Sequence, residues 1–456
     1  MLQIVHDLAP AAELSFASAA DGIFAFAENI RRLRSEAHAD ILVDDWFYIE
    51  EPFFQDGPIN IAIRDVTRDG ALYVTAGGNI NLTDTNGNAI GSYEAPNYRP
   101  IACPVLTDAQ TGGTVALSQD CHDFDPGTGE DALLGITLPP GGRTVVNFQW
   151  SEPWFGVRSD FDLYLADEQQ RVVARAESGL GFAPVEVFSY DNTSGVTQTL
   201  NLVAVRFTGN NTPRFKFTLG SAALREPGPV ALEYAGTRNG DNFGPTITDH
   251  ATAAHAIVVG AVSIDTPSQA EPFSSRGPAT LYWQPATSIR PAQPLTVPAL
   301  RRKPNVLAPN GVRTTFLGRP ALNEGPCDPS DPARNICRFF GTSAAAPHVA
   351  AVLALMKQRA NQADVHLSQR RAERILERSA APIVGDAETS NAGLVDALEA
   401  VTRVAGPGME PEPINLAEEQ GTPAPLKKDK VDAVGCLAAS QPHQPSAIRI
   451  ACARRP

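Results

Sequence analysis

Short apolar runs that alternate with helical segments constrain the fold of this chain most. A helical pattern from Ser18 to Ala37 precedes the apolar run Ile41–Val43, and a helix that starts at Asp56-Gly57-Pro58 precedes the run Leu72–Val74. Proline at the first helical position suits that start. Strands that are apolar at every position are buried on both faces, as in a parallel sheet between layers of helices. We therefore predict an α/β fold for this part of the chain.

The pattern changes between about residues 92 and 240. Phe215, Phe217 and Leu219 alternate there with polar residues, so we expect one buried and one exposed strand face. Turn clusters rich in proline and glycine separate such segments, which predicts an antiparallel β-sandwich or jelly-roll inserted into the α/β unit. The predicted strands lie at 144–150, 161–166, 185–190, 199–207 and 214–219.

The α/β pattern resumes after residue 240, with buried strands at 256–262 and 305–309. Helices are predicted at 344–356, 367–380 and 395–404. Beyond residue 405 the sequence is rich in proline and charge without periodicity, which favours a flexible tail. We thus expect four parts: 1–91 and 241–404 as the two halves of one catalytic domain, 92–240 as the inserted β domain, and 405–456 as the tail.

Charge and hydropathy exclude two classes of partner. The formal net charge of −14 argues against binding to nucleic acid or to an anionic membrane surface. No apolar run reaches the length of a membrane span. We therefore predict no nucleic-acid partner and no membrane span, and a monomer.

Six cysteines occur as three local pairs, which indicates disulfides and an oxidising compartment. Nearest-neighbour pairing is the most economical arrangement, although other connectivities or six free thiols in a cytosolic protein are alternatives. We expect a secreted or periplasmic protein whose export signal is absent from this chain. The pairs are Cys103 with Cys121, Cys327 with Cys337, and Cys436 with Cys452.

The segment GTSAAAPH, residues 341–348, runs from a small polar loop into an apolar helix and places Ser343 at the helix start. The helix dipole and the free N–H groups at such a start favour negative charge that develops beside the hydroxyl. This arrangement suits a serine nucleophile, whereas the same turn by itself is commonly only a helix cap.

Several segments together resemble the subtilisin family of serine proteases. GTSAAAPHVAAVLAL resembles the nucleophile segment of that family, and YVTAGGN at 73–79 resembles the strand that delivers its oxyanion-hole asparagine. The resemblance implies a serine endopeptidase that acts on polypeptides through an acyl-enzyme, with Ser343 as the nucleophile and Asn79 as an oxyanion donor. Three further segments agree in order: LAPAAEL at 8–14, FSSRGP at 273–278 and NVLAPNG at 305–311.

The same resemblance places residues along the substrate cleft. Gly77 and Gly78 lie beside the implied oxyanion asparagine, and Asp45 and Trp46 align with one cleft wall, where they would favour basic or apolar substrate side chains. Asp44 or Asp45 is an alternative candidate for base work of the kind that carboxylates perform in the related sedolisins. The favoured interpretation is a loop whose carboxylates cap backbone groups or are solvated.

The family's aspartate and histidine come from segments before LAPAAEL, and neither motif occurs in this chain. His6 lies too late in its helix to replace the histidine. His348 is expected to pack against its surroundings, and His250 and His255 are expected in loops. A serine hydroxyl without a base is a weak nucleophile, so we expect an N-terminally truncated protease with little activity. The alternative is a non-catalytic, protease-like protein that binds a partner through the β insert and the acidic cleft.

No cofactor is required by this chemistry. Two acidic segments, SDFDLYLAD at 159–167 and DPGTGED at 125–131, have the oxygen ligands that calcium prefers. Neither has the spacing of an EF-hand. Ordinary acidic turns are the favoured interpretation.

Overall fold

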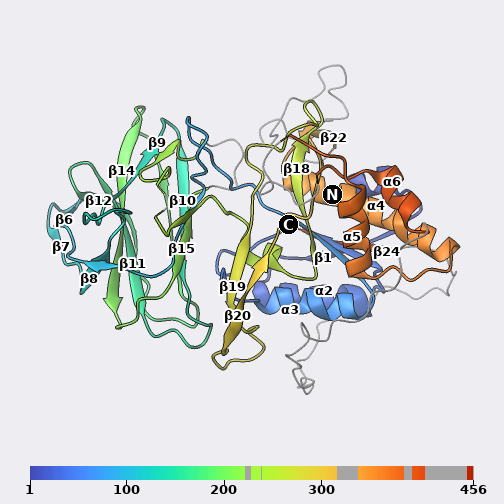
Figure 1. Ribbon diagram of the computed structural model, residues 1–456, viewed down its shortest axis with the longest axis horizontal. Helices are drawn as coiled ribbons and strands as arrows, with labels where there is room; N and C mark the ends of the chain where they lie inside the picture. The colour runs from blue at the N-terminus through green and yellow to red at the C-terminus, as the bar shows by residue number, and fades with distance from the viewer. Residues whose placement is uncertain (221–226, 238, 316–336, 385–392, 406–448, 455–456) are drawn as a thin grey trace.

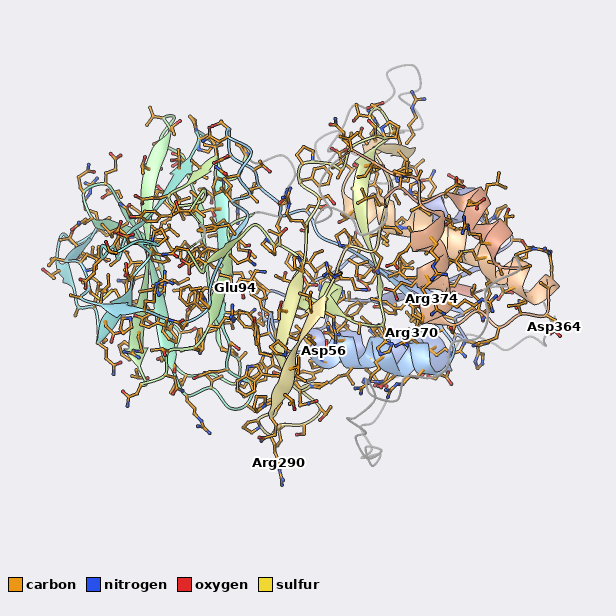
Figure 2. The ribbon with its side chains drawn as sticks, in the orientation of Figure 1. Asp56, Glu94, Arg290, Asp364, Arg370 and Arg374 are labelled. Carbon is orange, nitrogen blue, oxygen red and sulfur yellow. A yellow bond between two sulfur atoms is a disulfide. The ribbon has the colours of Figure 1, made fainter. Side chains whose placement is uncertain are left out.

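The computed structural model describes residues 1–220, 227–237, 239–315, 337–384 and 393–405, and the backbone of 449–454. Figure 1 shows the antiparallel strands gathered on one side of the molecule and the helices on the other. The hairpin of β19 (Ala279–Trp283) and β20 (Pro294–Arg301) lies between them. Asp56, which is labelled in Figure 2, lies 3.7 Å from Arg301 of this hairpin and connects the hairpin to the helical side.

A six-stranded sheet forms the centre of the helical side, with the order β1-β24-β2-β3-β18-β21. Every pair of neighbouring strands in it is parallel. The prediction of a parallel sheet is therefore confirmed. The strands are β1 (Glu13–Ser18), β24 (Arg449–Arg454), β2 (Ile41–Asp44), β3 (Leu72–Ala76), β18 (Ile257–Ser263) and β21 (Val306–Asn310).

Helices cover both faces of this sheet, because alternate residues of its strands point in opposite directions. Ile41 and Val43 belong to the core under α1, α4, α5 and α6, whereas Leu42 and Tyr73 belong to the core under α2 and α3. Burial on both faces explains why the central strands are apolar throughout. The helices are α1 (Leu2–Leu8), α2 (Ile23–Ser35), α3 (Pro58–Arg68), α4 (Thr342–Gln362), α5 (Gln369–Ser379), α6 (Ala397–Arg403) and the 3₁₀ helix η1 (Asp249–Thr252).

Local sequence sets where these helices begin. Pro58 opens α3, and the Gly57 N–H donates to Asn60 Oδ1 at 3.2 Å. The helix predicted from Ser18 begins only at Ile23, because residues up to Ser18 belong to β1 and Gly22 intervenes with φ of +95°. That backbone conformation favours glycine and ends the strand.

Residues between β3 and β18 form two sheets with a shared aromatic core that includes Phe148, Phe161 and Phe217. Their strands are antiparallel, except that β12 and β6 pair in parallel, and we call them the antiparallel sheets. Each strand predicted from alternation is present within one or two residues. The five-stranded sheet has the order β13 (Val185–Asp191), β10 (Arg143–Trp150), β15 (Phe215–Thr218), β4 (Ser92–Ala95) and β17 (Asn242–Phe243). The nine-stranded sheet contains β16 (Ala231–Leu232), β9 (Leu134–Leu138), β14 (Gln198–Thr208), β11 (Asp160–Asp167), β12 (Arg171–Ala176), β6 (Leu106–Asp108), β7 (Thr114–Val115), β5 (Pro100–Ile101) and β8 (Asp120–His122).

The expectation that β15 has one exposed face is wrong, because Lys216 and Thr218 are buried as well. Lys216 lies opposite Gln149 in the sheet register, and Gln149 is covered by the loop after β2. Phe53 N–H donates to Gln149 Oε1 at 3.0 Å, and Gln149 Nε2 donates to the Glu51 carbonyl at 2.9 Å. This loop therefore joins the five-stranded sheet to the helical side.

The expectation of a tail without regular structure is wrong for Arg449–Arg454. This segment forms β24 and pairs in parallel with β1 on one side and β2 on the other. The reason is that β1 and β2 need partners for their backbone N–H and carbonyl groups. A strand can supply these hydrogen bonds without a periodic pattern of side chains. The preceding residues 406–448 lie outside the described residues.

One of the predicted cysteine pairs lies wholly within the described residues, and a second lies partly within them. Cys103 and Cys121 form a disulfide as predicted. Cys337, in the small sheet of β22 (Val312–Thr314) and β23 (Cys337–Phe339), is disulfide-bonded, whereas Cys327 and Cys436 fall outside the described residues. Among the helices described, none combines the length and apolarity needed to cross a membrane.

Candidate active site

The end of β3 and the start of α4 bring Asn79 and Ser343 together, although 263 residues separate Asn79 from Thr342. Asn79 Nδ2 lies 3.0 Å, and Ser343 Oγ 3.5 Å, from the point where a Cβ on Gly341 would stand. Both side chains therefore face the same small space at the carboxyl edge of the parallel sheet. The sequence prediction that these two residues converge agrees with this geometry.

Thr342 fixes the orientation of the Asn79 amide. The Thr342 N–H and hydroxyl donate to Asn79 Oδ1 at 2.9 and 3.0 Å. The same hydroxyl accepts a hydrogen bond from the Gly78 N–H at 3.1 Å. With its oxygen held in this way, the Asn79 Nδ2 group has no acceptor among the described residues. It is thus a half-buried donor that lies, like the Ser343 hydroxyl, beside Gly341.

The helix start supplies a second donor. Ser343 follows the N-cap residue Gly341 by two positions, and no acceptor within the described chain takes its backbone N–H. The first N–H groups of a helix lack partners inside the helix and carry partial positive charge. The Ser343 N–H and the Asn79 amide are therefore available together for an anion at this point.

Gly341 is required for this approach. Its φ of +97° is in the left-handed region, and a Cβ there would stand 3.0 Å from Asn79 Nδ2. Its N–H donates to Asn310 Oδ1 at 3.2 Å, and the Asn310 Nδ2 group donates to the Val262 carbonyl at 2.7 Å. Strands β18 and β21 thus support the serine loop from below.

The two predicted cleft glycines form the turn before Asn79. Gly77 N–H donates to the Val259 carbonyl at 2.9 Å, and the Gly78 carbonyl accepts from Ser275 N–H at 3.0 Å. Gly78 has a φ of +96°, so a glycine suits this position. Their role in substrate binding stays a prediction.

No histidine or carboxylate in the described part of the chain hydrogen-bonds to Ser343 Oγ. His6 is exposed on α1. His348 lies 2.8 Å through Nδ1 from the Ala344 carbonyl of its own helix, and burial lowers its pKa. It therefore packs within α4, as the sequence suggested.

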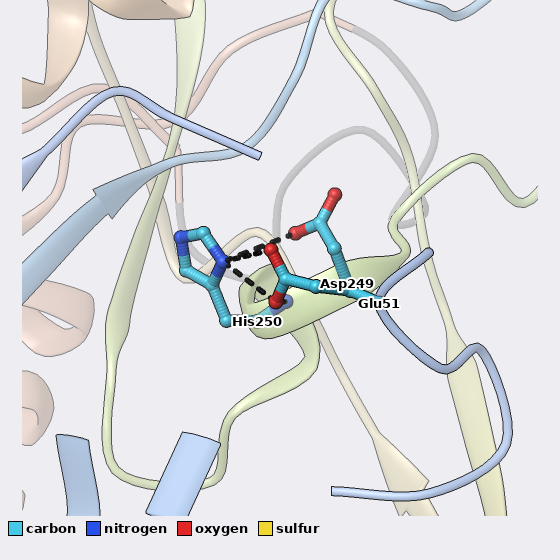
Figure 3. A group of neighbouring side chains, drawn as sticks. All are labelled: Glu51, Asp249 and His250. Atoms are coloured by element: carbon cyan, nitrogen blue, oxygen red, sulfur yellow. Dashed lines mark hydrogen bonds and ion pairs between the residues drawn. The ribbon is translucent and has the colours of Figure 1, made fainter. Parts of the chain in front are cut away.

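A buried hydrogen-bond network lies near the carboxyl ends of β2 and β3. His250 is held between two carboxylates: its Nε2 lies 3.0 Å from Asp44 Oδ1 and its Nδ1 lies 2.9 Å from Glu51 Oε2. Figure 3 shows Glu51 and Asp249 on the same side of the imidazole ring. Asp44 also accepts hydrogen bonds from the Tyr73 hydroxyl at 2.6 Å and the Thr75 hydroxyl at 2.8 Å.

The electrostatics of this network favour a charged imidazole. Burial disfavours that charge, but the Glu51 and Asp44 carboxylates outweigh it and hold the pKa of His250 well above its ordinary value of 6.5. Burial also raises the pKa of Asp249 to about 7. The imidazolium is thus the cation that neutralises this acidic group.

The expectation of a loop for His250 is wrong, because His250 lies in η1 and is 0% exposed. Asp44 is 1% exposed and so not solvated, although its Oδ1 accepts a hydrogen bond from the Trp46 N–H at 3.5 Å, as expected of a capping carboxylate. Both belong with Tyr73 to the face of the sheet that packs against α2 and α3, whereas Ser343 begins a helix on the opposite face. Asp44 is therefore not positioned as the base of this serine. The closely spaced acids of DDWFYIEE were the only sequence signal of the network.

Asp45 and Trp46 follow directly after β2. Asp45 is half-buried. Trp46 is packed edge-on against Tyr48, with ring centroids 5.9 Å apart, and against the core under α2 and α3. Contact of either side chain with substrate stays a prediction.

Within the described ranges, two groups of side chains have the spacing of metal ligands: Glu51 with Asp249 and His250, and Asp160 with Asp162 and Glu186. The first already contains its own cation in His250. The second lies in the antiparallel sheets. The segment at 125–131 is an acidic turn, as expected, in which Asp125 Oδ1 accepts from the Gly127 N–H.

Comparison with known proteins gives the family. A model of the subtilase family (Peptidase S8) matches residues 135–408, which includes Ser343 but not Asn79. Among solved structures, the chain is similar to the CspB protease of Clostridium perfringens at 13% identity and a TM-score of 0.45, with 84% of this chain and 70% of that chain covered. It is also similar to the patellamide maturation protease PatA at 18% identity and a TM-score of 0.23, with 35% and 46% covered. No curated protein matches the sequence. Because the family match extends over more than half of its residues, the chain belongs to the subtilase family.

Proposed function

We propose that the chain carries a serine peptidase site that cleaves polypeptides by acyl transfer. Ser343 Oγ is the nucleophile that attacks the substrate carbonyl carbon, and the Asn79 amide and the Ser343 N–H receive the oxygen that becomes negative. The observation that carries this proposal is the orientation of Asn79, whose oxygen is occupied by Thr342 while its Nδ2 donor is left beside Ser343. Donors fixed in advance around a developing oxyanion are a major source of rate in acyl transfer.

The proton of the Ser343 hydroxyl needs an acceptor, and the described residues bring none within hydrogen-bonding distance. We therefore expect slow cleavage of peptide bonds by this polypeptide, since a hydroxyl without a base is a poor nucleophile. Oxyanion stabilisation and binding alone still give a residual acceleration of about 10³–10⁴-fold in serine proteases that lack triad members. Acylation by an activated ester, which needs less help from a base, should be easier to detect.

The lack of a proton acceptor near Ser343 among the described residues favours a second candidate function. A subtilase fold without a base at Ser343 can serve as a protein that binds a partner rather than cleaves it. In that case the antiparallel sheets and the acidic residues after β2 would make the contacts. Acyl transfer is preferred because packing of the fold does not require an unbonded amide donor next to an accessible serine.

We further propose the division of the chain into a catalytic domain built from 1–91 and 241–404 and an inserted β domain at 92–240. Separate cores in the parallel and antiparallel parts support this division. The disulfide between Cys103 and Cys121 supports a secreted or periplasmic protein. We propose a monomer.

The test of the function is a burst experiment with a p-nitrophenyl ester of a blocked peptide, followed by mass spectrometry of the protein. A burst of nitrophenol with the acyl group on Ser343 is expected, and Ser343→Ala should abolish it. Ser194→Ala, in the loop after β13, serves as the matched control and should leave the burst unchanged. A chain that forms no acyl adduct at Ser343 would contradict the enzyme and favour the binding protein.

Substrate preference belongs to the same proposal. Asp45, with Trp46 and the glycines 77 and 78, is proposed to line the cleft, and its carboxylate would attract a basic substrate side chain. We expect Asp45→Asn to lower the ratio of acylation by lysyl to leucyl esters several-fold. An unchanged ratio would remove Asp45 from the cleft while leaving the role of Ser343 intact.

A further inference from the structure

A second acidic group lies in the antiparallel sheets, far in sequence from the residues of the proposed active site. Asp160 and Asp162 project from β11 in the nine-stranded sheet, and Glu186 projects from β13 in the five-stranded sheet. Their carboxylate oxygens lie within 4.8 Å of one another. The group therefore joins the two sheets at one point.

All three residues are largely buried. Asp160 is 5% exposed, Asp162 6% and Glu186 2%. Glu186 Oε1 accepts from the Ser178 N–H at 3.0 Å and from the Ser178 hydroxyl. Asp160 and Asp162 accept no hydrogen bond and form no ion pair with any described residue. Buried polar groups without partners are rare and costly, and a buried charge without a partner is more so.

The charges around the group do not compensate it. Burial raises the pKa of Asp162 to about 7, and the like charges of Asp160 and then of Glu177 act in the same direction. Burial also raises the pKa of Glu186 to about 7. Arg175 pairs instead with Glu177 at 3.2 Å and is 45% exposed. Three carboxylates thus converge at a point where no cation of a described residue pairs with them.

We propose that Asp160, Asp162 and Glu186 bind a calcium ion that holds the two antiparallel sheets together. Carboxylate oxygens are the ligands that Ca²⁺ prefers, at 2.3–2.6 Å, so oxygens on opposite sides of the ion are about 5 Å apart. The observed separation of at most 4.8 Å fits this value. The absence of histidine and cysteine from these three residues disfavours zinc, which prefers nitrogen and sulfur. The sequence favours an acidic turn at 159–167; the strand β11 instead presents two of its acids together.

Calcium titration of the full chain, first treated with EGTA, tests the proposal. Calcium at a hundredfold excess over its Kd should raise the melting temperature by about 5–10 °C, as expected for a specific ligand of a domain of this size. Magnesium at the same concentration should give a clearly smaller shift, because Mg²⁺ demands tighter geometry and loses its water reluctantly. A wild-type chain without a calcium shift, or with an equal magnesium shift, would overturn the assignment.

The double variant Asp160→Asn/Asp162→Asn distinguishes a calcium site from a merely structural pair. It should bind one Ca²⁺ fewer than the wild type and lose the calcium shift. In EGTA it should melt at the same temperature as the wild type or higher, because it removes the repulsion between uncompensated carboxylates. Asp125→Asn, in the exposed acidic turn, is the matched control and should keep the full shift. Undiminished calcium binding by the double variant, or a lower melting temperature than the wild type in EGTA, would contradict the proposal.

Discussion

At the scale of single residues, the candidate site depends on which atom of Asn79 faces Ser343. Thr342 supplies two donors to Asn79 Oδ1, so the amide cannot turn its oxygen toward the substrate without losing both bonds. An asparagine held in this way is a donor before substrate arrives. The chemical consequence is that stabilisation of the oxyanion requires no rearrangement of this side chain.

We expect Asn79→Ala to lower the rate of acylation at Ser343 by roughly 10²–10³-fold, the usual cost of removing one oxyanion donor. The melting temperature should fall as well, because the N–H and hydroxyl of buried Thr342 lose their acceptor, so the rate is compared well below the melting temperature of the variant. The rate is measured with the activated peptide ester. Asn86→Ala, at an exposed turn position, is the control, and a rate for Asn79→Ala equal to that control would exclude Asn79 from the site.

The convergence of Asn79 and Ser343 could be predicted from the sequence, because each lies in a segment with a strong family resemblance. The contact of His250 with Asp44 could not. These residues are 206 positions apart, and a hydrogen bond between a lone histidine and a distant carboxylate leaves no periodic pattern. The same limit applies to Asp160 and Glu186, which meet only because two sheets face each other.

At the scale of elements, the starts of α2 and α4 form a natural comparison. Their N-cap residues, Gly22 and Gly341, have nearly identical backbone angles, with φ of +95° and +97°. A Cβ on Gly22 would meet nothing within 4 Å, whereas a Cβ on Gly341 would approach Asn79. The two helix starts therefore differ in what surrounds them and not in their backbone conformation.

Both Gly22→Ala and Gly341→Ala should lose about 1–3 kcal/mol of stability from the left-handed backbone alone. Only Gly341→Ala should also displace Asn79 and reduce ester acylation to the level of Asn79→Ala. Urea unfolding and the burst rate of each variant measure the two effects separately. Equal burst rates in the two variants would show that the close approach at Gly341 is not needed.

The network around His250 connects β2, β3 and η1 and should make stability depend on pH. Because the pKa of His250 is raised above its unfolded value near 6.5, its stabilising effect is complete below that pH. The effect is lost as the pH rises through the folded pKa. Asp249 acts in the same direction between its ordinary value of 3.8 and about 7.

We expect His250→Gln to destabilise the fold by about 3–5 kcal/mol, since it leaves Asp44 and Glu51 buried without a cation. The variant should also lose the part of the decline in unfolding free energy that the wild type shows above about pH 6.5. Urea unfolding between pH 5.5 and 9 measures both, with exposed His6→Gln as the control. Parallel pH curves for wild type and His250→Gln would show that folding does not raise the pKa of His250.

Prediction of secondary structure from the sequence succeeded for strands that are buried on both faces. The runs at 41–43 and 256–262 are apolar at every position because both faces of β2 and β18 are covered. It failed for β24, which is held in the sheet by backbone pairing with β1 and β2. It also failed at Lys216, which is buried beside Gln149, the residue that hydrogen-bonds to a loop from outside their sheet.

At the scale of the whole molecule, the loop after β2 holds the antiparallel and parallel parts together. Gln149, 1% exposed on β10, bonds to both the Phe53 N–H and the Glu51 carbonyl. Asn147 of the same strand donates to the Ile49 carbonyl at 2.9 Å. A polar contact of this kind fixes the relative position of two parts more specifically than apolar packing does.

We expect Gln149→Ala to cost about 1–3 kcal/mol for each of the two backbone groups that it leaves unsatisfied. Gln149→Met, which keeps most of the volume, should lose nearly as much, because hydrogen bonds and not cavity filling are removed. Differential scanning calorimetry measures the loss, with exposed Gln169→Ala as the control. Full stability of Gln149→Met would show that these bonds do not hold the two parts together.

The two contacts of Glu51 matter for domain grafting. Its carboxylate hydrogen-bonds to His250, and its carbonyl accepts a hydrogen bond from Gln149. A graft of residues 92–240 into another protease scaffold would lack the segment 49–55, whose main chain hydrogen-bonds to Gln149 on the five-stranded sheet. The grafted domain should fold stably only if residues 49–55 are included in the graft, or if the recipient already offers backbone N–H and carbonyl groups in the same positions.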